Sequence, residues 1–555
     1  MTGRSDFADV VVVGSGAGGS PVALELARAG AHVVVLEKGR HVTPASMVHD
    51  EVAKRRHFMV PDPREEPHTL RYGDEATAAP TVEGWTANIV GGGTVHYSGF
   101  FHRMHPVDMR LRSTMGAIDG ADVADWPISY ADLEPYYRRV DEEIGVSGSW
   151  KAHPHEEPRS APYPLPPIDE HPIAQRIDEA ASRLGMHTFP TPRAVLSRPY
   201  RGRSACSYCS TCADYGCPTG AKGSTLASLL PAAMATGRCE IRAQCMATEV
   251  VVRDDGRVDG VVYRDAEGLT RFLRARVVVL ACTAVETARL LLLSRSSLFP
   301  EGLANRNGLV GRNLLFSSGA LGGATFASSE PAGVRRHLSA QRSVQDLYFM
   351  DSPIDGVRKA GTLGFLIGFV EPIGMAEAVA FRSGSTGGPD QVVWGSQLKQ
   401  GLRDRLRQQQ LHFESFCEFY ANQGTYVDLD PTVKDRWGAP VARMTVAPHP
   451  LTRDATRLVA KKAMEVLTAM GPEQAYVSTQ QTETKFLQGG TCRFGDDPAT
   501  SVLDKTCRAH EVPNLYVSDG SFLPTSGGVP LTMTIMANAF RVAGSMVSRL
   551  RAGQL

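Results

Sequence analysis

The stretch from Asp9 to Ser20, DVVVVGSGAGGS, decides the fold of this chain. Its continuous apolar run, DVVVV, predicts a buried parallel strand, because strands that are covered on both faces do not alternate with polar residues. The glycine-rich turn leads into SPVALELARAGA, whose apolar residues recur at helical spacing, and then into a second apolar strand, HVVVLEKG. Together these segments form a complete β–α–β unit, the building block of a Rossmann-like α/β domain.

The spacing of the glycines in this unit predicts a dinucleotide site. Gly14 allows the tight turn, Gly16 lets the backbone approach a pyrophosphate, and Gly19 lets the helix pack against the strand. Glu37, at the end of the second strand, is placed to accept a hydrogen bond from a ribose 2′-hydroxyl, and an acid there disfavours a 2′-phosphate. The unit alone does not distinguish FAD from NAD.

The bulk composition is that of an ordinary globular protein. The chain has 555 residues, 42% hydrophobic and 21% charged, so we expect two domains or one large domain with an insertion. Lys plus Arg equals Asp plus Glu at 59 each, which gives no reason to expect nucleic acid or a membrane as a partner. The sequence contains no run of about 18 apolar residues, so we expect no membrane-spanning helix.

The first residues run almost directly into a strand, and we therefore expect no signal peptide. This predicts a cytoplasmic location. The ten cysteines would then lie in a reducing compartment, where structural disulfides are rare.

Two distant segments favour FAD. Residues 274–295, RARVVVLACTAVETARLLLLSR, predict another buried strand that turns into a helix, and NLYVSDGSFLP predicts a last strand that ends at Asp519 and Gly520. In flavoenzymes of this architecture such an acid reaches the ribityl chain, and the following helix points its N-terminus at the flavin. We also predict that Val250 and Ala281 contact the cofactor.

These pieces resemble the glucose–methanol–choline (GMC) family of FAD oxidoreductases. The motifs that carry the resemblance, in chain order, are GSGAGGS, NIVGGGTVHYSGFFHR, ETARLLLLSR, VDLDPTVKDRWGAPV and GGTCRFGDDPATSV…NLYVSDGSFLPTSGG. The resemblance implies an α/β fold with a discontinuous Rossmann-like FAD-binding domain, and a substrate domain whose antiparallel sheet roofs the flavin. It also implies oxidation of a small polar metabolite, such as a sugar, a cyclitol or a natural-product intermediate, by hydride transfer to flavin N5.

The expected domain boundaries follow from changes in composition and hydrophobic pattern along the chain. We assign residues 1–150, 205–310 and 480–555 to the FAD-binding domain and 311–479 to the substrate domain. Residues 151–204 are predicted to be a Pro-rich linker with part of the substrate domain, and seven prolines between 151 and 172 exclude a helix there. The alternating segments GALGGATFA and TYVDLD suggest the antiparallel sheet.

The second motif, GGGTVHYSG, supplies further expected cofactor contacts. The resemblance assigns Gly92, Gly93, Thr94 and His96 to the flavin site. In some relatives a histidine that matches His96 is covalently bonded to the flavin ring. The alternative is a histidine that is hydrogen-bonded within a tight loop.

Four cysteines lie close together in RSACSYCSTCADYGCP. Cys206, Cys209, Cys212 and Cys217 have the spacing C-x2-C-x2-C-x4-C, one residue longer in the last gap than the ferredoxin run. An iron–sulfur cluster, a zinc ion and a set of plain reduced thiols are all compatible with this pattern. A cluster would make the protein a dehydrogenase that passes single electrons to a carrier, rather than an oxidase.

The expected catalytic pair is replaced. Family members place a histidine three residues before the Gly-Thr of the GTCR segment, where this chain has Leu487, and an Asn or His where it has Pro530. Neither side chain can take the hydroxyl proton that must leave with the hydride. The base could then come from elsewhere, from Gln488, Lys485, His96 or a loop residue, or the substrate could be acidic enough to need none.

Three functions remain open at this point. The first is an oxidoreductase with atypical proton handling, whose apolar site would also suit carbon–carbon desaturation or amine oxidation. The second is a different flavin chemistry, such as that of the family's light-driven fatty acid decarboxylase, which also lacks the usual pair. The third is a flavin-binding protein without turnover. Intact FAD motifs favour the first, because redox parts have no use in a binding module.

Overall fold

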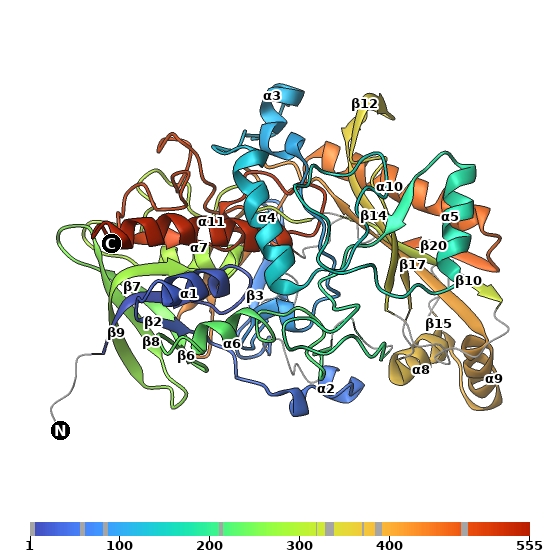
Figure 1. The fold of residues 1–555 in the computed structure, drawn as a ribbon, viewed down its shortest axis with the longest axis horizontal. Helices are drawn as coiled ribbons and strands as arrows, with labels where there is room; N and C mark the ends of the chain where they lie inside the picture. Colours follow the sequence, from blue (N-terminus) through green and yellow to red (C-terminus); the bar gives the residue numbers. More distant parts are fainter. Residues whose placement is uncertain are drawn as a thin grey trace.

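The computed structural model describes residues 6–55, 62–81, 87–209, 212, 215–317, 319–327, 338–368, 371–382, 391–478 and 487–555. Two large sheets lie at opposite ends of an elongated molecule, and both chain termini lie at the end that holds the first sheet (Figure 1).

The first sheet has seven strands and contains the predicted β–α–β unit. Its strands are β6 (Cys239–Arg242), β2 (Val33–Leu36), β1 (Phe7–Val13), β9 (Thr270–Leu280), β8 (Val258–Arg264) and β7 (Met246–Val252) in spatial order, with β21 (Leu515–Val517) also paired to β9. The strands β6, β2, β1, β9 and β21 run parallel to one another. The strand β8 pairs antiparallel with β9, and β7 pairs antiparallel with β8. One half of β9 pairs with β8 and the other half with β21, so the C-terminal segment completes the sheet.

Helices cover this sheet. They are α1 (Gly19–Arg28), α6 (Leu229–Met234), α7 (Ala284–Leu293) and α11 (Thr532–Arg551). The helix α1 lies against α6 and α11, and α11 also contacts α4 (Tyr130–Ile144) (Figure 1). Strands β1 and β2 are buried almost completely, as their continuous apolar runs predict. The α/β class and the Rossmann-like cofactor domain are thereby confirmed.

The second sheet, here called the roof sheet, is antiparallel throughout. Its order is β20 (Gln474–Ser478), β10 (Leu321–Ala327), β17 (Gln408–Cys417), β14 (Gly361–Ile367), β11 (Ala340–Val344) and β5 (Thr188–Pro190). The helices α10 (Pro450–Ala469) and α5 (Ile173–Arg183) pack on one face, where Leu411 and Phe413 of β17 join their core. Alternation along β17 therefore turns Glu414 and Phe416 toward the opposite face.

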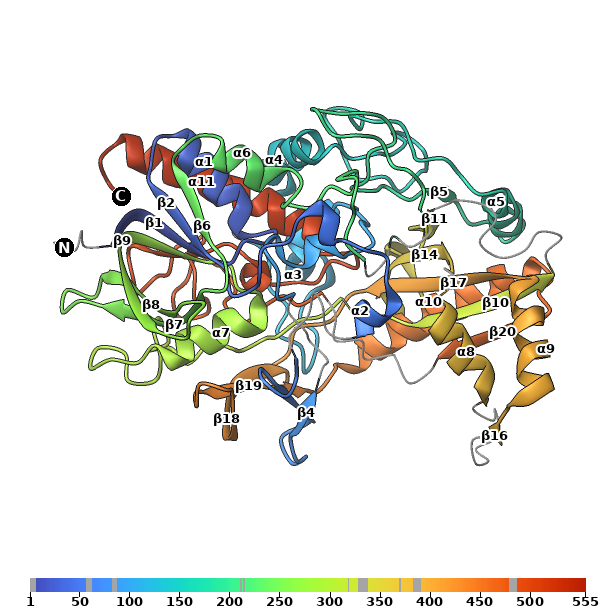
Figure 2. The same ribbon diagram turned by 90° about the horizontal axis from the view of Figure 1, so that it is seen from below.

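A separate four-stranded sheet corrects one expectation. TYVDLD was expected in the same sheet as GALGGATFA, but it forms most of β18 (Tyr426–Lys434). This strand is at the edge of a sheet with the order β18, β19 (Pro440–Val446), β3 (His68–Tyr72) and β4 (Ala79–Thr81) (Figure 2). The pairing of β19 with β3 is parallel and joins segments more than 370 residues apart. A pattern of local alternation carries no information about such a partner.

The remaining elements are short. They are η1 (Pro44–Ser46), α2 (Glu51–Arg55), η2 (Gly92–Val95), η3 (Pro106–Arg110), α3 (Leu111–Met115), β12 (Phe349–Ile354), β13 (Val357–Lys359), α8 (Pro372–Ala380), β15 (Phe381–Arg382), β16 (Gln391–Val392), α9 (Gly395–Leu406) and η5 (Gly520–Phe522). Residues 151–172 contain no helix, as their prolines predict. No helix in the described part of the chain is long and apolar enough to span a bilayer.

Candidate active site

A cavity of about 400 Å³ lies beside the first sheet, at the β1–α1 turn, and we call it the cofactor cavity. Seven parts of the chain line it: the β1–α1 turn, the end of β2, residues 87–97, the start of β7, the β9–α7 turn, residues 487–488 with 519–520, and the start of α11. Of the sequence-predicted site residues, Gly14, Gly16, Glu37, Gly92, Gly93, Thr94, His96, Ala281, Leu487, Gln488, Asp519 and Gly520 line the cavity.

The β1–α1 turn leaves no room for side chains. Gly14 has a φ of +101°, and a Cβ atom on it would lie 2.2 Å from the carbonyl oxygen of Ala281. A Cβ on Gly19 would lie 2.0 Å from the carbonyl oxygen of Gly14. The N-terminus of α1 therefore opens directly into the cavity, where backbone N–H groups and the helix dipole suit a pyrophosphate.

Glu37 is held by the turn that it faces. Its Oε2 accepts hydrogen bonds from the Ser15 N–H at 3.0 Å and the Ser15 hydroxyl at 2.6 Å, and its Oε1 accepts from the Gly39 N–H at 2.8 Å. Burial raises the pKa of Glu37, and these donors oppose the rise. A carboxylate has about four acceptor positions, so one remains for a ribose hydroxyl.

The second glycine motif packs on the first. The Gly91 N–H donates to Ser15 Oγ at 2.8 Å, and a Cβ on Gly92 would lie 3.0 Å from Gly16 Cα. Thr94 donates to the Gly91 carbonyl at 2.7 Å and accepts from the N–H of Thr225 at 3.0 Å. This places His96 and Tyr97 on the cavity wall. The bracing role of Thr225 had no signal in the sequence.

Asp519 accepts hydrogen bonds that join two segments of the chain, a role that the sequence did not predict. Its Oδ2 accepts from the Thr283 N–H at 3.0 Å and from the Thr287 hydroxyl at 2.5 Å. Its Oδ1 accepts from both the N–H and the hydroxyl of Ser521. Asp519 thus ties the start of α7 to the segment after β21, beside the cavity.

Three predicted residues lie outside the cavity lining. Gly19 packs against the turn, in agreement with its expected role. Val250 lies in the hydrophobic core and its N–H donates to Ser294 Oγ at 2.9 Å, whereas the β7 residues that line the cavity are Met246 and Ala247. Pro530 is buried, and its neighbours Leu531 and Thr532 line the cavity instead.

The wall that should carry the base is apolar. Leu487 packs with Phe100 and Phe416, whose rings are 5.3 Å apart, so the expected histidine position faces a hydrophobic cluster. The side-chain oxygen of Gln488 accepts from the N–H of Val285 at 3.3 Å, and an amide is not a base. Lys485 lies outside the described residues.

The SGG turn before Pro530, residues 526–528, is held by buried charged side chains from distant segments of the chain. Glu418 accepts from the N–H groups of Ser526 at 3.0 Å and Gly527 at 2.9 Å. Lys359 is fully buried, donates to the Gly527 carbonyl at 3.1 Å and forms an ion pair with Asp108 at 3.0 Å. Burial raises the pKa of Glu418, and Lys359, at 3.7 Å, opposes the rise.

The four cysteines do not gather as closely as the ligands of a zinc ion. No three of their sulfur atoms, all within the described residues, lie within 4.8 Å of one another. Cys212 is buried among Ile168, Val195 and Leu338, and Cys206 packs against the same cluster. Burial raises the pKa of Cys206 to about 12. The thiolates of an iron–sulfur cluster lie further apart than the ligands of a single ion, so the cluster stays a prediction.

Replacing Glu37 by alanine is expected to weaken FAD binding about tenfold to a hundredfold, the usual worth of one hydrogen bond to a charged group. The change removes the ribose acceptor and leaves the Ser15 and Gly39 N–H groups without theirs. The measurement is the flavin-to-protein ratio after purification, together with FAD titration of the apoprotein. Glu240→Ala, on the exposed side of neighbouring β6, is the matched control. Equal flavin retention in both variants would refute the assignment.

Comparison with known proteins agrees with this geometry. Two models of the family "GMC oxidoreductase" match residues 79–317 and 422–539, and an "FAD binding domain" model matches residues 9–47. The chain is 30% identical to 2-methyl-1,2-propanediol dehydrogenase of Mycolicibacterium austroafricanum, over 99% of this chain and 96% of that one. It is 31% identical to 6'''-hydroxyparomomycin C oxidase of Streptomyces lividus, over 98% and 92%. Among solved structures, pyridoxine 4-oxidase from Mesorbium loti aligns with a TM-score of 0.61 at 18% identity, over 97% of this chain and 99% of that one, and so shares the fold.

Proposed function

Because the chain belongs to the GMC oxidoreductase family and is an FAD-dependent oxidoreductase, we propose that it oxidises an alcohol group of a small polar metabolite. Bound FAD supplies the hydride acceptor, flavin N5. The single observation that carries the proposal is the cofactor cavity, which extends from the nucleotide-binding turn to Leu487, the residue that packs against Phe416 of the roof sheet. The two named relatives act, by their names, on a diol and an aminoglycoside, and a polyhydroxylated substrate follows from that likeness.

We assign the role of proton acceptor to a residue that the sequence analysis did not identify. The inner face of the roof sheet, defined here by Gly364, Leu366, Glu414 and Phe416, is opposite to the face that packs on α10. Phe416 packs against Leu487, which lines the cofactor cavity, and this contact brings the inner face of the roof sheet next to the cavity wall.

Glu414 lies next to Phe416 on this face, two residues earlier in β17, and is half-buried. Opposite it in the sheet is Gly364, where a Cβ would lie 3.2 Å from the ring of Phe100. Glu414 is thus a carboxylate beside the apolar wall of Leu487, Phe100 and Phe416. His412, the next residue on the face, bonds through Nδ1 to the Tyr476 hydroxyl at 3.1 Å and lies further from that wall.

In the proposed reaction the substrate carbon loses a hydride to the cofactor, and its hydroxyl proton passes to the Glu414 carboxylate. The C–H bond and the O–H bond break, and a carbonyl group forms. Leu487 and the two phenylalanines exclude water from the reacting carbon, and His96 lies on the cavity wall. Carboxylates are among the side chains that serve as general bases.

The proposal is tested by anaerobic reduction. A panel of vicinal diols, sugars and amino sugars is added without oxygen, and loss of the flavin's visible absorption with formation of the carbonyl product is the expected result. Product that forms only under blue light would select the lyase chemistry instead. Bound FAD that no compound reduces would leave a flavin-binding protein without turnover.

We further propose that the protein is a dehydrogenase rather than an oxidase. The reduced enzyme is expected to be reoxidised faster by a one-electron acceptor such as ferricenium than by air-saturated buffer, measured by stopped flow. Faster reoxidation by oxygen would refute this. No electron path is assigned to the cysteine loop, and an iron and sulfide assay checks its composition directly.

Acid precipitation tests whether the flavin is bound covalently through His96. A yellow pellet would show the covalent bond, and a yellow supernatant would show a non-covalent site. A His96→Ala variant that moves the colour from the pellet to the supernatant would identify His96 as the attachment point.

We propose that the protein works in the cytoplasm. None of the ten cysteines, all of which lie in the described part of the chain, forms a disulfide. Cysteines without disulfides are typical of proteins in a reducing compartment.

A further inference from the structure

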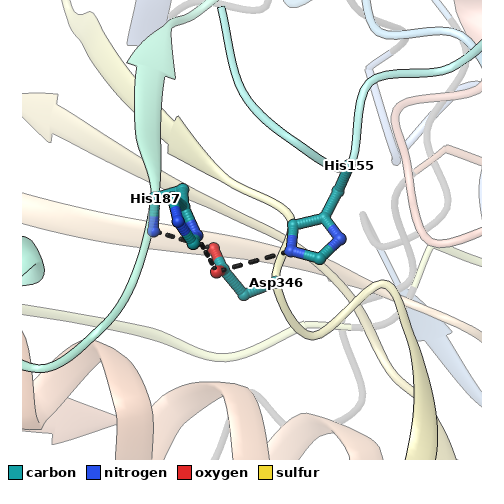
Figure 3. Close-up of side chains that lie close together, drawn as sticks. All are labelled: His155, His187 and Asp346. Carbon is teal, nitrogen blue, oxygen red and sulfur yellow. Dashed lines mark hydrogen bonds and ion pairs between the residues drawn. The ribbon is translucent and has the colours of Figure 1, made fainter.

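A group of metal-ligating side chains lies at one edge of the roof sheet, away from the cofactor cavity. It consists of His155, His187 and Asp346 (Figure 3). His155 belongs to the Pro-rich connection 151–172, His187 immediately precedes β5, and Asp346 follows β11 by two residues. Three segments that are distant in sequence thus turn ligand atoms toward one point.

The distances suit a metal ion. Asp346 Oδ1 lies 2.7 Å from His187 Nδ1 and 3.6 Å from His155 Nε2, and the three ligand atoms all lie within 4.8 Å of one another. Bonds of about 2.0–2.2 Å to a tetrahedral zinc ion place neighbouring ligand atoms about 3.3 Å apart. The side chains therefore need only small rotations to coordinate one ion.

The carboxylate is already oriented. The backbone N–H of His187 donates to Asp346 Oδ2 at 3.1 Å, which leaves Oδ1 facing the two imidazoles (Figure 3). Such a hydrogen bond to the non-ligating oxygen is typical of the outer shell of metal sites. A plain hydrogen bond between His187 and Asp346 would explain the 2.7 Å distance, but it gives no reason for His155 to turn its Nε2 to the same oxygen.

We propose that His155, His187 and Asp346 bind one divalent transition-metal ion, with Zn²⁺ as the best match. Two imidazoles and one carboxylate leave a fourth position for water, and this donor set suits Zn²⁺ and other late first-row ions rather than Mg²⁺ or Ca²⁺. The exposed fractions of the side chains, 41% for His155 and 54% for His187, allow an ion to enter from solvent.

The bound ion would fasten the edge of the roof sheet. The strand β5 has three residues and pairs on one side with β11, so it is a short edge strand. His153, two residues before His155, stacks on Phe189 of β5 at 3.8 Å. A metal at this point would hold the Pro-rich connection against β5 and β11 together.

The test is zinc titration of the flavin-loaded protein after chelator treatment, by calorimetry. The wild type is expected to bind one more equivalent than each of His155→Ala, His187→Ala and Asp346→Asn. The readout is the difference in zinc stoichiometry between the wild type and each variant, because cysteine thiols also bind zinc and contribute equally to both. His41→Ala, which removes an exposed histidine elsewhere, should keep the full stoichiometry.

Thermal unfolding gives a second readout. Zinc is expected to raise the melting temperature of the wild type and of His41→Ala more than that of the three variants. Equal melting temperatures and flavin contents in EDTA would show that the variants fold. A wild type that binds no more zinc than the variants would overturn the proposal.

Discussion

Changing Glu414 to glutamine is expected to slow anaerobic flavin reduction by the alcohol substrate about 10²–10⁴-fold, the usual contribution of a general base. The reason is geometric: Glu414 is the carboxylate on the inner face of the roof sheet that borders Phe416 and the Leu487 wall. Glutamine keeps the size of the side chain and cannot accept the proton. Stopped-flow reduction as a function of pH is the measurement.

Two further variants make this result specific. Glu473→Gln changes an exposed carboxylate just before β20 and should leave the rate unaltered. Leu487→His in the Glu414→Gln background should restore about tenfold or more of the rate and introduce a pKa near that of imidazole. The backbone of Leu487 has a φ of +56°, a left-handed conformation that histidine adopts more readily than leucine. An unchanged rate in Glu414→Gln would refute the assignment of the base.

Lys359→Met is expected to lower the free energy of unfolding by about 3–5 kcal/mol, the cost of removing one partner from a buried ion pair. The change leaves Asp108 and Glu418, both fully buried, without their cation. The Gly527 carbonyl also loses a donor. The measurement is the urea midpoint of the flavin-loaded enzyme, with flavin release followed in parallel.

Lys461→Met is the matched control for this variant. Lys461 pairs with Asp355 at 3.1 Å, but both side chains are more than half exposed, and such pairs contribute about 0–1 kcal/mol. Because the lost contacts hold the SGG turn, Lys359→Met should also release flavin earlier in the titration. Equal midpoints for the two variants would show that the buried charges do not stabilise the turn.

Much of the cofactor site could be read from the sequence because its constraints are local. The glycines of the β1–α1 turn and the acid at the end of β2 lie within one β–α–β unit, where spacing alone fixes their geometry. The prolines of residues 151–172 act within one segment. Each of these features appears in the structure where the pattern places it.

The rest depends on partners that no local pattern specifies. Lys359, Asp108 and Glu418 come from three segments and meet only around the SGG turn. The proposed role of Glu414 depends on alternation in β17 together with the position of Leu487, and neither can be recognised in a local pattern. The cysteine spacing suggested a metal site, but no three of the four sulfur atoms, each in a described residue, lie within 4.8 Å of one another. Residues 155, 187 and 346 converge through the pairing of β5 with β11.

The place of β21 in the first sheet has a consequence for how the chain matures. Its partner, β9, ends at Leu280, but β21 begins at Leu515 and is followed by the cavity residues Asp519, Gly520 and Thr532. At about 5–20 residues per second, the ribosome needs roughly ten to fifty seconds between the two strands. Throughout that time the nascent sheet has an open edge and no complete flavin site. Cofactor capture therefore waits until β21 and the cavity residues that follow it have been synthesised.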